Sequence, residues 1–322
     1  MSQIVCGDVL EVLRSLEPDS FDIGVTSPPY NKGGAGKNKG WLVNSIQYES
    51  NPDRMPEDQY QNSQISVLDE LYRVIKPGGS FFYNHKVRWE RGVMIHPMDW
   101  LRKTKWDVRQ EIIWDRKIAA QIRGYRFWQT DERIYWLYKP VGDNHIGEEM
   151  NSKHALLTEI WNIRPENKID HPAPFPIALP VRCLYSVLDD SKGKRVIDPY
   201  MGSGTTAVAC KFLGHEYFGI DCSQTYIEMA NKRAENYLSE QKAFDEEIAQ
   251  HYVKESFKER KAAGKWEGKK KAYETEPRDE LCFHGGPELP VLDDWTAPMF
   301  FLPPDDLTKP DDCDKLICRG QE

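Results

Sequence analysis

A short segment near the start of the chain, residues 26–30, reads TSPPY and carries groups that suit chemistry on an amino group. The exocyclic amino group of cytosine or adenine is a poor nucleophile, because its lone pair is delocalised into the ring. Acceptors at the Ser27 hydroxyl and the Pro28 carbonyl would bind the amino hydrogens and free that lone pair. Pro29 stiffens the backbone, and Tyr30 offers a ring that can stack on a base. A proline-stiffened surface turn is the alternative interpretation.

A second segment, residues 198–205, reads DPYMGSGT and fits a loop that holds a nucleotide-like cofactor. An apolar run precedes it and a helical pattern follows it, as in a strand–loop–helix unit. Gly202 and Gly204 allow the backbone to pass close to a ligand. The next predicted strand ends at Asp221, 17 residues beyond Gly204, where a carboxylate can accept hydrogen bonds from both ribose hydroxyls. Taken alone, the glycines also fit an ordinary tight turn.

The acid at the start of this second segment indicates the class of cofactor. Asp198 would repel a pyrophosphate at the start of the following helix, whereas it would suit a cationic ammonium group. S-adenosylmethionine carries an ammonium and a sulfonium and no phosphate, so it is favoured over a nicotinamide dinucleotide. A dehydrogenase is the alternative. The cofactor contacts of this loop are expected from Asp198, Pro199, Gly202, Ser203, Gly204 and Thr205.

The two segments together resemble the motifs of the amino-methylating DNA methyltransferases. Residues 198–205 match the signature D-P-[FY]-x-G-S-G-T, and residues 27–30 resemble the catalytic motif. The catalytic motif comes first, as in the permuted (beta) class, and the resemblance covers residues 2–238. It implies transfer of a methyl group from S-adenosylmethionine to the exocyclic amino group of a flipped base. Ser27 at the first motif position resembles cytosine-N4 enzymes; adenine N6 is the alternative, because some adenine enzymes also carry serine.

The resemblance adds three features to the predicted cofactor site. Residues 171–176 look like the H-P-x-x-x-P segment that lines the methionine end of the cofactor, which implies contacts from His171, Pro172 and Phe175. Asp8 looks like the acid that contacts the cofactor adenine. A proline-rich connector is the alternative for the first segment, and a plain helix N-cap is the alternative for Asp8.

The cysteines predict neither a covalent nucleophile nor a metal site. None of the seven follows a proline, so the Pro-Cys nucleophile of the ring-carbon methylating enzymes is absent. Methyl transfer to an amino group needs alignment rather than a nucleophilic side chain. The spacing of the cysteines and histidine near the C-terminus fits structural zinc poorly, so no metal is predicted at Cys282, His284, Cys313 and Cys318.

Alternating apolar strand and helix patterns predict a mostly parallel, doubly wound α/β sheet, a Rossmann-like methyltransferase fold in permuted order. A helix pattern ending before the turn KPGG at residues 76–79 leads to a predicted strand at 80–83. Residues 108–114 and 133–138 are expected to form an antiparallel pair. The predicted divisions are a methyltransferase domain at 1–238 (catalytic half 1–140, connector 141–160, cofactor half 161–238), a charged helical extension at 239–273 and an acidic, proline-rich tail at 274–322.

The charge distribution is compatible with binding double-stranded DNA, although the chain of 322 residues has a net charge of −8. Residues 274–322 hold 13 acids and 4 Lys or Arg, a net of −9, which leaves about +1 (−8 less −9) for the rest. A basic cluster at residues 116–126 is interleaved with aromatic residues. Phosphate contacts are expected from Lys32, Lys37, Lys39, Arg123 and Arg126, with Arg116 and Lys117 in the same cluster. A DNA-binding protein without catalysis is an alternative, against which both intact motifs argue.

The remaining composition predicts a soluble cytoplasmic enzyme of bacterial, archaeal or phage origin. No run of eighteen apolar residues and no basic-then-apolar N-terminal signal is present, and the cysteines are scattered. Expected partners are double-stranded DNA and, in the same system, a cognate restriction endonuclease, with no membrane. The sequence leaves monomer and homodimer both open.

Overall fold

The computed structural model describes residues 2–31, 55–119, 124–145, 158–166 and 175–251, together with Ala262 and Gly264. One compact unit spans Met1–Ala262. Several predicted residues lie outside the described residues: Lys32, Lys37, Lys39, Arg123, His171, Pro172, the four candidate zinc ligands and the tail at 274–322.

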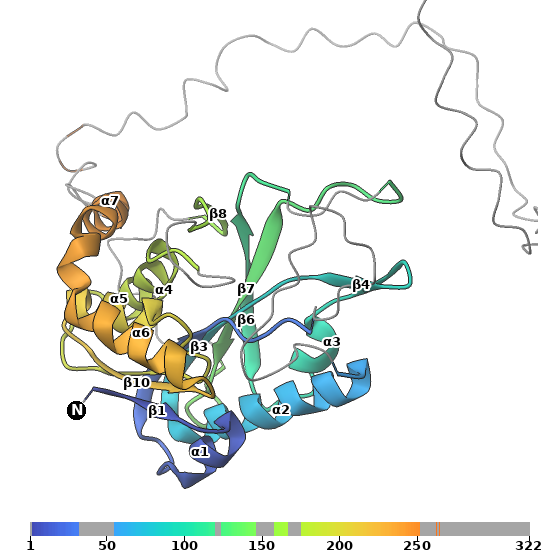
Figure 1. The fold of residues 1–322 in the computed structure, drawn as a ribbon, viewed down its shortest axis with the longest axis horizontal. Coiled ribbons are helices and arrows are strands. Elements are labelled where there is room, and N and C mark those ends of the chain that lie inside the picture. The colour runs from blue at the N-terminus through green and yellow to red at the C-terminus, as the bar shows by residue number, and fades with distance from the viewer. Residues whose placement is uncertain are drawn as a thin grey trace, which may run out of the picture. The chain divides into compact units, whose positions relative to one another are not determined.

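An eight-stranded sheet forms the centre of the unit, in the order β1-β10-β9-β2-β3-β7-β6-β8 (Figure 1). Neighbours from β1 to β3 are parallel, β7 is antiparallel to both β3 and β6, and β8 is parallel to β6. This confirms the mostly parallel sheet and the antiparallel pair. The strands are β1 Gln3–Cys6, β2 Phe21–Thr26, β3 Ile75–His85, β6 Asp107–Asp115, β7 Asp131–Tyr138, β8 Ile160–Asn162, β9 Arg195–Asp198 and β10 Glu216–Asp221.

Helices cover both faces of this sheet, as expected for a doubly wound fold (Figure 1). Successive strand residues point to opposite faces: Phe81 packs with the first three helices, whereas Phe82 packs with α4, α5 and α6. The helices are α1 Val9–Ser15, α2 Glu57–Val74, α3 Met98–Leu101, α4 Ala178–Leu188, α5 Thr205–Leu213, α6 Gln224–Glu235, the short 3-10 helix Tyr237–Glu240 and α7 Gln241–His251.

The junction between α2 and β3 differs from the predicted turn. The helix ends at Val74 and the strand begins at once with Ile75, which pairs with Phe21, whereas Ser80 pairs with Ile23. Residues 76–79 are therefore a bulge inside β3. A Cβ at Gly79 would lie 2.8 Å from the Asp22 carbonyl oxygen, so only glycine allows this close approach.

One hairpin was not anticipated from the sequence, whereas α7 lies within the helical extension predicted at 239–273. β4 Arg88–Glu90 and β5 Val93–Ile95 form a separate two-stranded hairpin whose turn places Arg91 and Gly92 at positive φ. α7 packs on α4, where Arg182 and Glu247 form a buried ion pair at 2.6 Å. The compact unit thus continues past the boundary predicted at residue 238. Among the helices in the described ranges, none has the length and apolar character that crossing a membrane requires.

Candidate active site

The two sequence motifs meet at the carboxyl edge of the sheet, where open α/β sheets bind ligands. β2 pairs directly with β9, so the strand that ends at Thr26 lies beside the strand that ends at Asp198. The Thr26 hydroxyl donates a hydrogen bond of 2.7 Å to Asp198 Oδ1. Residues separated by 172 positions in the chain are thereby joined at the start of each motif.

Asp198 has a structural role that differs from the sequence interpretation. Its side chain has no exposed surface, and its Oδ2 accepts a 2.6 Å bond from the Thr206 hydroxyl. The Tyr200 backbone N–H donates to Oδ1 at 3.1 Å. Burial raises the pKa of Asp198 to about 6, although the bonds from Thr206 and Thr26 oppose that rise. A direct contact with a cofactor ammonium does not fit this burial; the carboxyl group holds the turn together.

The glycine loop after β9 is shaped by close packing. Gly204 precedes α5 with φ +83, and a Cβ there would lie 2.7 Å from Ala230 Cβ on α6. The hydroxyls of Ser203 and Thr205 both accept from Arg233, at 3.2 and 2.7 Å, and both residues are buried. The loop can therefore approach a ligand through its backbone, while these two hydroxyls are held by Arg233. Pro199 is buried as well.

Two acids flank this loop at the ends of adjacent strands. Asp221 accepts backbone N–H bonds of 2.9 Å from Gly202 and from Ser223, and burial raises its pKa despite them. Asp8 is exposed and caps α1, accepting from Leu10 and Glu11 at 2.9 and 3.1 Å. β1 pairs with β10, so the two carboxylates lie at the same edge. The N-cap prediction for Asp8 is confirmed.

Phe175 and Pro176 are the described members of the predicted H-P-x-x-x-P segment, and Phe175 makes the contacts. Its carbonyl accepts a 3.3 Å bond from the Thr205 hydroxyl. Its side chain lines a cavity of about 10 Å³ together with Ser27 and Asn84, room for about one water molecule. Phe175 therefore lies between the glycine loop and residues 26–30, the catalytic segment.

A polar network surrounds the hydroxyls of the catalytic segment. Ser27 Oγ and the Tyr30 hydroxyl lie 2.8 Å apart, and the Tyr30 hydroxyl donates to Glu132 Oε2 at 2.9 Å. Asn84 Nδ2 donates to the Tyr30 hydroxyl at 2.8 Å and to Ser27 Oγ at 3.2 Å. Arg116 pairs with Glu132 Oε1 at 2.7 Å. Arg116 thus belongs to the site rather than to the phosphate-binding cluster expected from the sequence.

Asn84 and Glu132 are the site residues that sequence reasoning missed. Asn84 lies near the end of β3 and Glu132 near the start of β7, and neither belongs to a local motif. Both are polar residues beside the end of a predicted strand. Such a position predicts a site residue only when the order of the strands in the sheet is known. Asn84 Oδ1 is buried, with no hydrogen-bond partner among the described residues.

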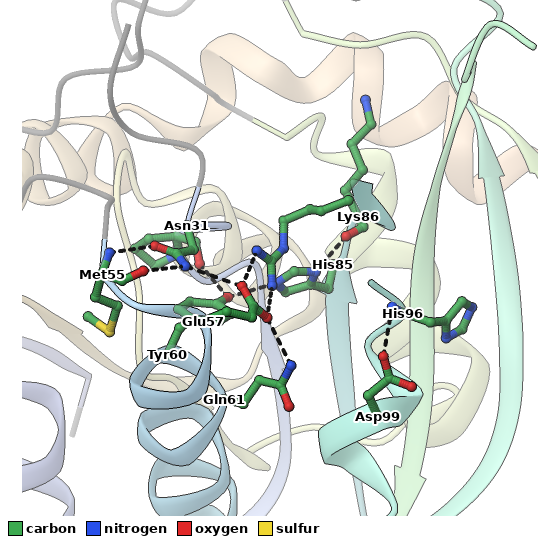
Figure 2. Close-up of polar contacts among 11 residues, drawn as sticks. Asn31, Met55, Glu57, Tyr60, Gln61, His85, Lys86, His96 and Asp99 are labelled. Carbon is green, nitrogen blue, oxygen red and sulfur yellow. Dashed lines mark hydrogen bonds and ion pairs between the residues drawn. The ribbon is translucent and has the colours of Figure 1, made fainter. Parts of the chain in front are cut away.

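Helix α2 supports the catalytic segment from the other side. The Tyr60 hydroxyl donates to the Pro29 carbonyl at 2.7 Å and lies 2.7 Å from His85 Nε2 (Figure 2). The ring of Tyr30 packs against His85 with centroids 4.6 Å apart. In contrast, no described donor bonds the Pro28 carbonyl. That oxygen keeps its capacity to accept from a ligand.

The chain leaving the motif is tied to the start of α2. The Asn31 side chain donates to the Met55 carbonyl at 3.0 Å and accepts from the Met55 N–H at 2.7 Å (Figure 2). Glu57 forms a bidentate pair with Arg88 at 2.7 and 2.8 Å and also accepts from Gln61 at 2.9 Å. Burial opposes ionisation of Glu57, but bonds from Arg88 and its neighbours hold the pKa of Glu57 below its usual value. The exit of the motif is therefore fixed by Asn31 and by the charged network around Glu57.

The predicted DNA-contact cluster is described only around Arg126. Its guanidinium lies 3.9 Å from the ring centroid of Trp89 on β4, so this hairpin and the β6–β7 connection are in contact. Exposed aromatic side chains follow it: Phe127 is 98% and Trp128 is 61% exposed. Lys117 pairs with Asp115 at 2.6 Å across exposed surface.

Comparison with known proteins decides the family. The family model described as DNA methylase, N6_N4_Mtase, matches residues 21–232, which is more than half of the chain. The chain belongs to this DNA methylase family. It is an S-adenosylmethionine-dependent DNA methyltransferase that modifies either cytosine N4 or adenine N6.

Individual relatives agree with the family and with the fold. The Type II methyltransferase M.HpaI of Haemophilus parainfluenzae is 25% identical over 270 residues, covering 76% of this chain and 78% of its own length. The PvuII cytosine-N4-specific DNA methyltransferase has a TM-score of 0.55 at 16% identity, and the match covers 75% of this chain and 91% of the PvuII chain. TTHA0409 of Thermus thermophilus, solved with S-adenosylmethionine, has a TM-score of 0.52 at 24% identity. The match covers 74% of this chain and 96% of the TTHA0409 chain.

In this methyltransferase the segment at residues 26–30 precedes the glycine loop along the chain, the order expected for the permuted class. Strand pairing nevertheless places Thr26 beside Asp198, and Ser27 and Phe175 line one small cavity. The glycine loop and the segment at residues 26–30 thus both begin at the carboxyl edge of the sheet.

Proposed function

We propose that this methyltransferase modifies the N4 amino group of a cytosine flipped out of double-stranded DNA. The observation that carries the proposal is the pair of acceptors in the catalytic segment. Ser27 Oγ is half-buried beside Tyr30 and Asn84, and the Pro28 carbonyl has no described donor. Serine at the first motif position favours cytosine, because the resembling cytosine-N4 enzymes carry it. Adenine N6 is the second candidate.

The cofactor site fits S-adenosylmethionine on two observations. Gly204 packs closely on Ala230 of α6, which holds the loop at the carboxyl edge of the sheet, and Asp221 keeps acceptor capacity beyond its backbone bonds. Asp221 would bind the ribose and Asp8 would contact the adenine. Phe175, with His171 and Pro172 outside the described residues, would line the methionine end. The bound cofactor supplies an electrophilic methyl group.

The protein's part in the reaction is to hold the amino group in line and to raise its nucleophilicity. Ser27 Oγ and the Pro28 carbonyl each accept one amino hydrogen, which localises the nitrogen lone pair. Tyr30 stacks on the flipped base, and the packing of His85 against its ring fixes that platform. Positioning and preorganised acceptors together supply the acceleration.

Double-stranded DNA would lie against the surface around Arg126. The guanidinium is stacked on Trp89, and the neighbouring rings of Phe127 and Trp128 are largely exposed. Cationic and aromatic side chains in one place suit phosphates and unstacked bases. Because M.HpaI is a Type II methyltransferase, we also propose a cognate restriction endonuclease and a cytoplasmic location.

Mass spectrometry of nucleosides tests the base choice directly. DNA incubated with the protein and S-adenosylmethionine should yield N4-methylcytosine, and N6-methyladenine alone would overturn the cytosine assignment. Ser27→Ala should abolish most of the product while leaving cofactor affinity unchanged. Glu70→Gln, on the outer face of α2 in a partly exposed pair with Arg73, is the matched control and should behave as wild type.

A further inference from the structure

Glu132 stands at the end of a hydrogen-bonded path that begins at the catalytic serine. The path runs from Ser27 Oγ to the Tyr30 hydroxyl over 2.8 Å and on to Glu132 Oε2 over 2.9 Å. Its three members come from the end of β2 and the start of β7, which are distant in sequence and separated in the sheet by β3. Glu132 is 6% exposed, so the path ends inside the protein.

The direction of every bond in this path is fixed by the number of protons available. The Tyr30 hydroxyl has one proton, and the Glu132 carboxylate can only accept, so Tyr30 donates to Glu132. The 2.8 Å contact between Ser27 and Tyr30 must then be a donation from Ser27. Asn84 Nδ2 fills the second acceptor position of the Tyr30 oxygen.

This direction leaves the Ser27 oxygen prepared for an amino group. Ser27 Oγ gives its proton to Tyr30, accepts from Asn84 at 3.2 Å, and keeps one further acceptor position. Successive donation toward a carboxylate polarises each oxygen, which makes Ser27 a stronger acceptor than an isolated hydroxyl. The Arg116 guanidinium, 2.7 Å from Glu132 Oε1, holds the carboxylate in place and compensates its charge.

We propose that Glu132 is a positioning residue that polarises Ser27 through Tyr30 and receives the proton that the target amino group must lose. This deepens, and rests on, the proposed amino-group methylation. The nitrogen lone pair forms the bond to the methyl carbon while the carbon–sulfur bond breaks, its electron pair staying on sulfur. The nitrogen then loses one proton to Ser27 Oγ, the Ser27 proton passes to Tyr30, and the Tyr30 proton passes to Glu132.

Two substitutions each interrupt this hydrogen-bonded path at a different residue. Tyr30→Phe keeps the ring against His85 but removes the hydroxyl that joins Ser27 to Glu132. Glu132→Gln keeps an oxygen that accepts from Tyr30 but removes the charge and the proton acceptor. Since both changes break the same path, their effects should not add.

The test is single-turnover methylation of a duplex together with direct affinities for DNA and S-adenosylmethionine. Each variant should slow the methylation step about 10²-fold, and the double variant should be no slower than either. The affinities should stay within about twofold of wild type, because these bonds act on the chemical step. Glu70→Gln again serves as the control.

Three outcomes would overturn the inference: either variant methylating at the wild-type rate, multiplicative slowing in the double variant, or a loss confined to DNA affinity. Where Glu132→Gln unfolds the protein, as a thermal melt would show, Tyr30→Phe decides alone. A wild-type protein that yields no methylated base on any DNA would instead refute the proposed function, so the two failures are distinguishable.

Discussion

Replacing Asp198 by asparagine should change how the stability of this methyltransferase depends on pH. The carboxyl group has no exposed surface, and its pKa is about 6 against an ordinary value of 3.8, chiefly because of burial. Between these two pH values the folded protein binds more protons at this site than the unfolded chain. The contribution of Asp198 to the free energy of unfolding is therefore full below pH 3.8 and falls as the pH rises to about 6.

The size of the pKa shift of Asp198 determines how much the free energy of unfolding changes with pH. At about 1.4 kcal/mol for each pKa unit, the contribution lost across the window is about 3 kcal/mol. The amide that replaces the carboxyl group in Asp198→Asn cannot titrate, so the variant should lack this decline. The Thr26 and Thr206 hydroxyls can still bond the amide oxygen, and Thr206 can turn to accept from the amide N–H, so the turn should persist.

Urea unfolding of both proteins from about pH 4 to about pH 8 measures the difference. Acids such as Glu57 have lowered pKa values and act in the opposite sense, but they are common to both proteins and cancel in the comparison. The free energy of unfolding of wild type minus that of the variant should fall by about 2.5 kcal/mol over this range, because the decline has already begun at about pH 4. A difference that is constant with pH would refute the assignment of a raised pKa to buried Asp198.

Three further changes test the cofactor edge and the helical extension. Asp221→Ala should weaken S-adenosylmethionine binding by about 1–3 kcal/mol, measured by calorimetry on a folded variant; unchanged affinity would remove Asp221 from the site. Gly204→Ala should destabilise the protein by about 1–3 kcal/mol, because its Cβ meets Ala230 and φ is positive; an unchanged melting temperature would contradict this packing. Arg182→Met should cost about 1–3 kcal/mol in urea unfolding, because buried Glu247 would lose its bonds from Arg182 and keep those from His251 and Gln250; unchanged stability would contradict this pairing.

The strands and helices around both motifs could be predicted because their signals are local. The apolar run before Asp198, the glycines at 202 and 204 and the helical pattern after Thr205 each determine the backbone nearby. The N-cap at Asp8 is equally local, since its carboxylate accepts from the two following backbone N–H groups. The local backbone at these positions, and the N-cap at Asp8, could therefore be predicted from the sequence.

The rest of the site depends on strand order, which no local pattern encodes. Glu132 reaches Tyr30 only because β7 lies beside β3, and β3 lies beside β2. Asp198 shows the reverse case: its chemistry as an acid pointed to a cationic ligand, but its neighbours Thr26 and Thr206 use both carboxylate oxygens. Burial and partner choice are properties of the folded sheet, so charge alone could not predict that both carboxylate oxygens bond inside the protein.

The pairing of β2 with β9, rather than the order of the two segments along the chain, determines how the two segments lie relative to each other. That pairing places the Thr26–Asp198 bond at the first residue of both segments. From this point the chain runs on one side into Ser27 and Tyr30, and on the other into the glycine loop. A displacement of either strand end would move the amino-group acceptors relative to the cofactor edge, and misplacement of about 1 Å is costly in a reaction that depends on alignment. The buried carboxyl group of Asp198 thus holds the ends of β2 and β9 together through Thr26, and under the proposed function this contact sets the distance between the amino-group acceptors and the cofactor.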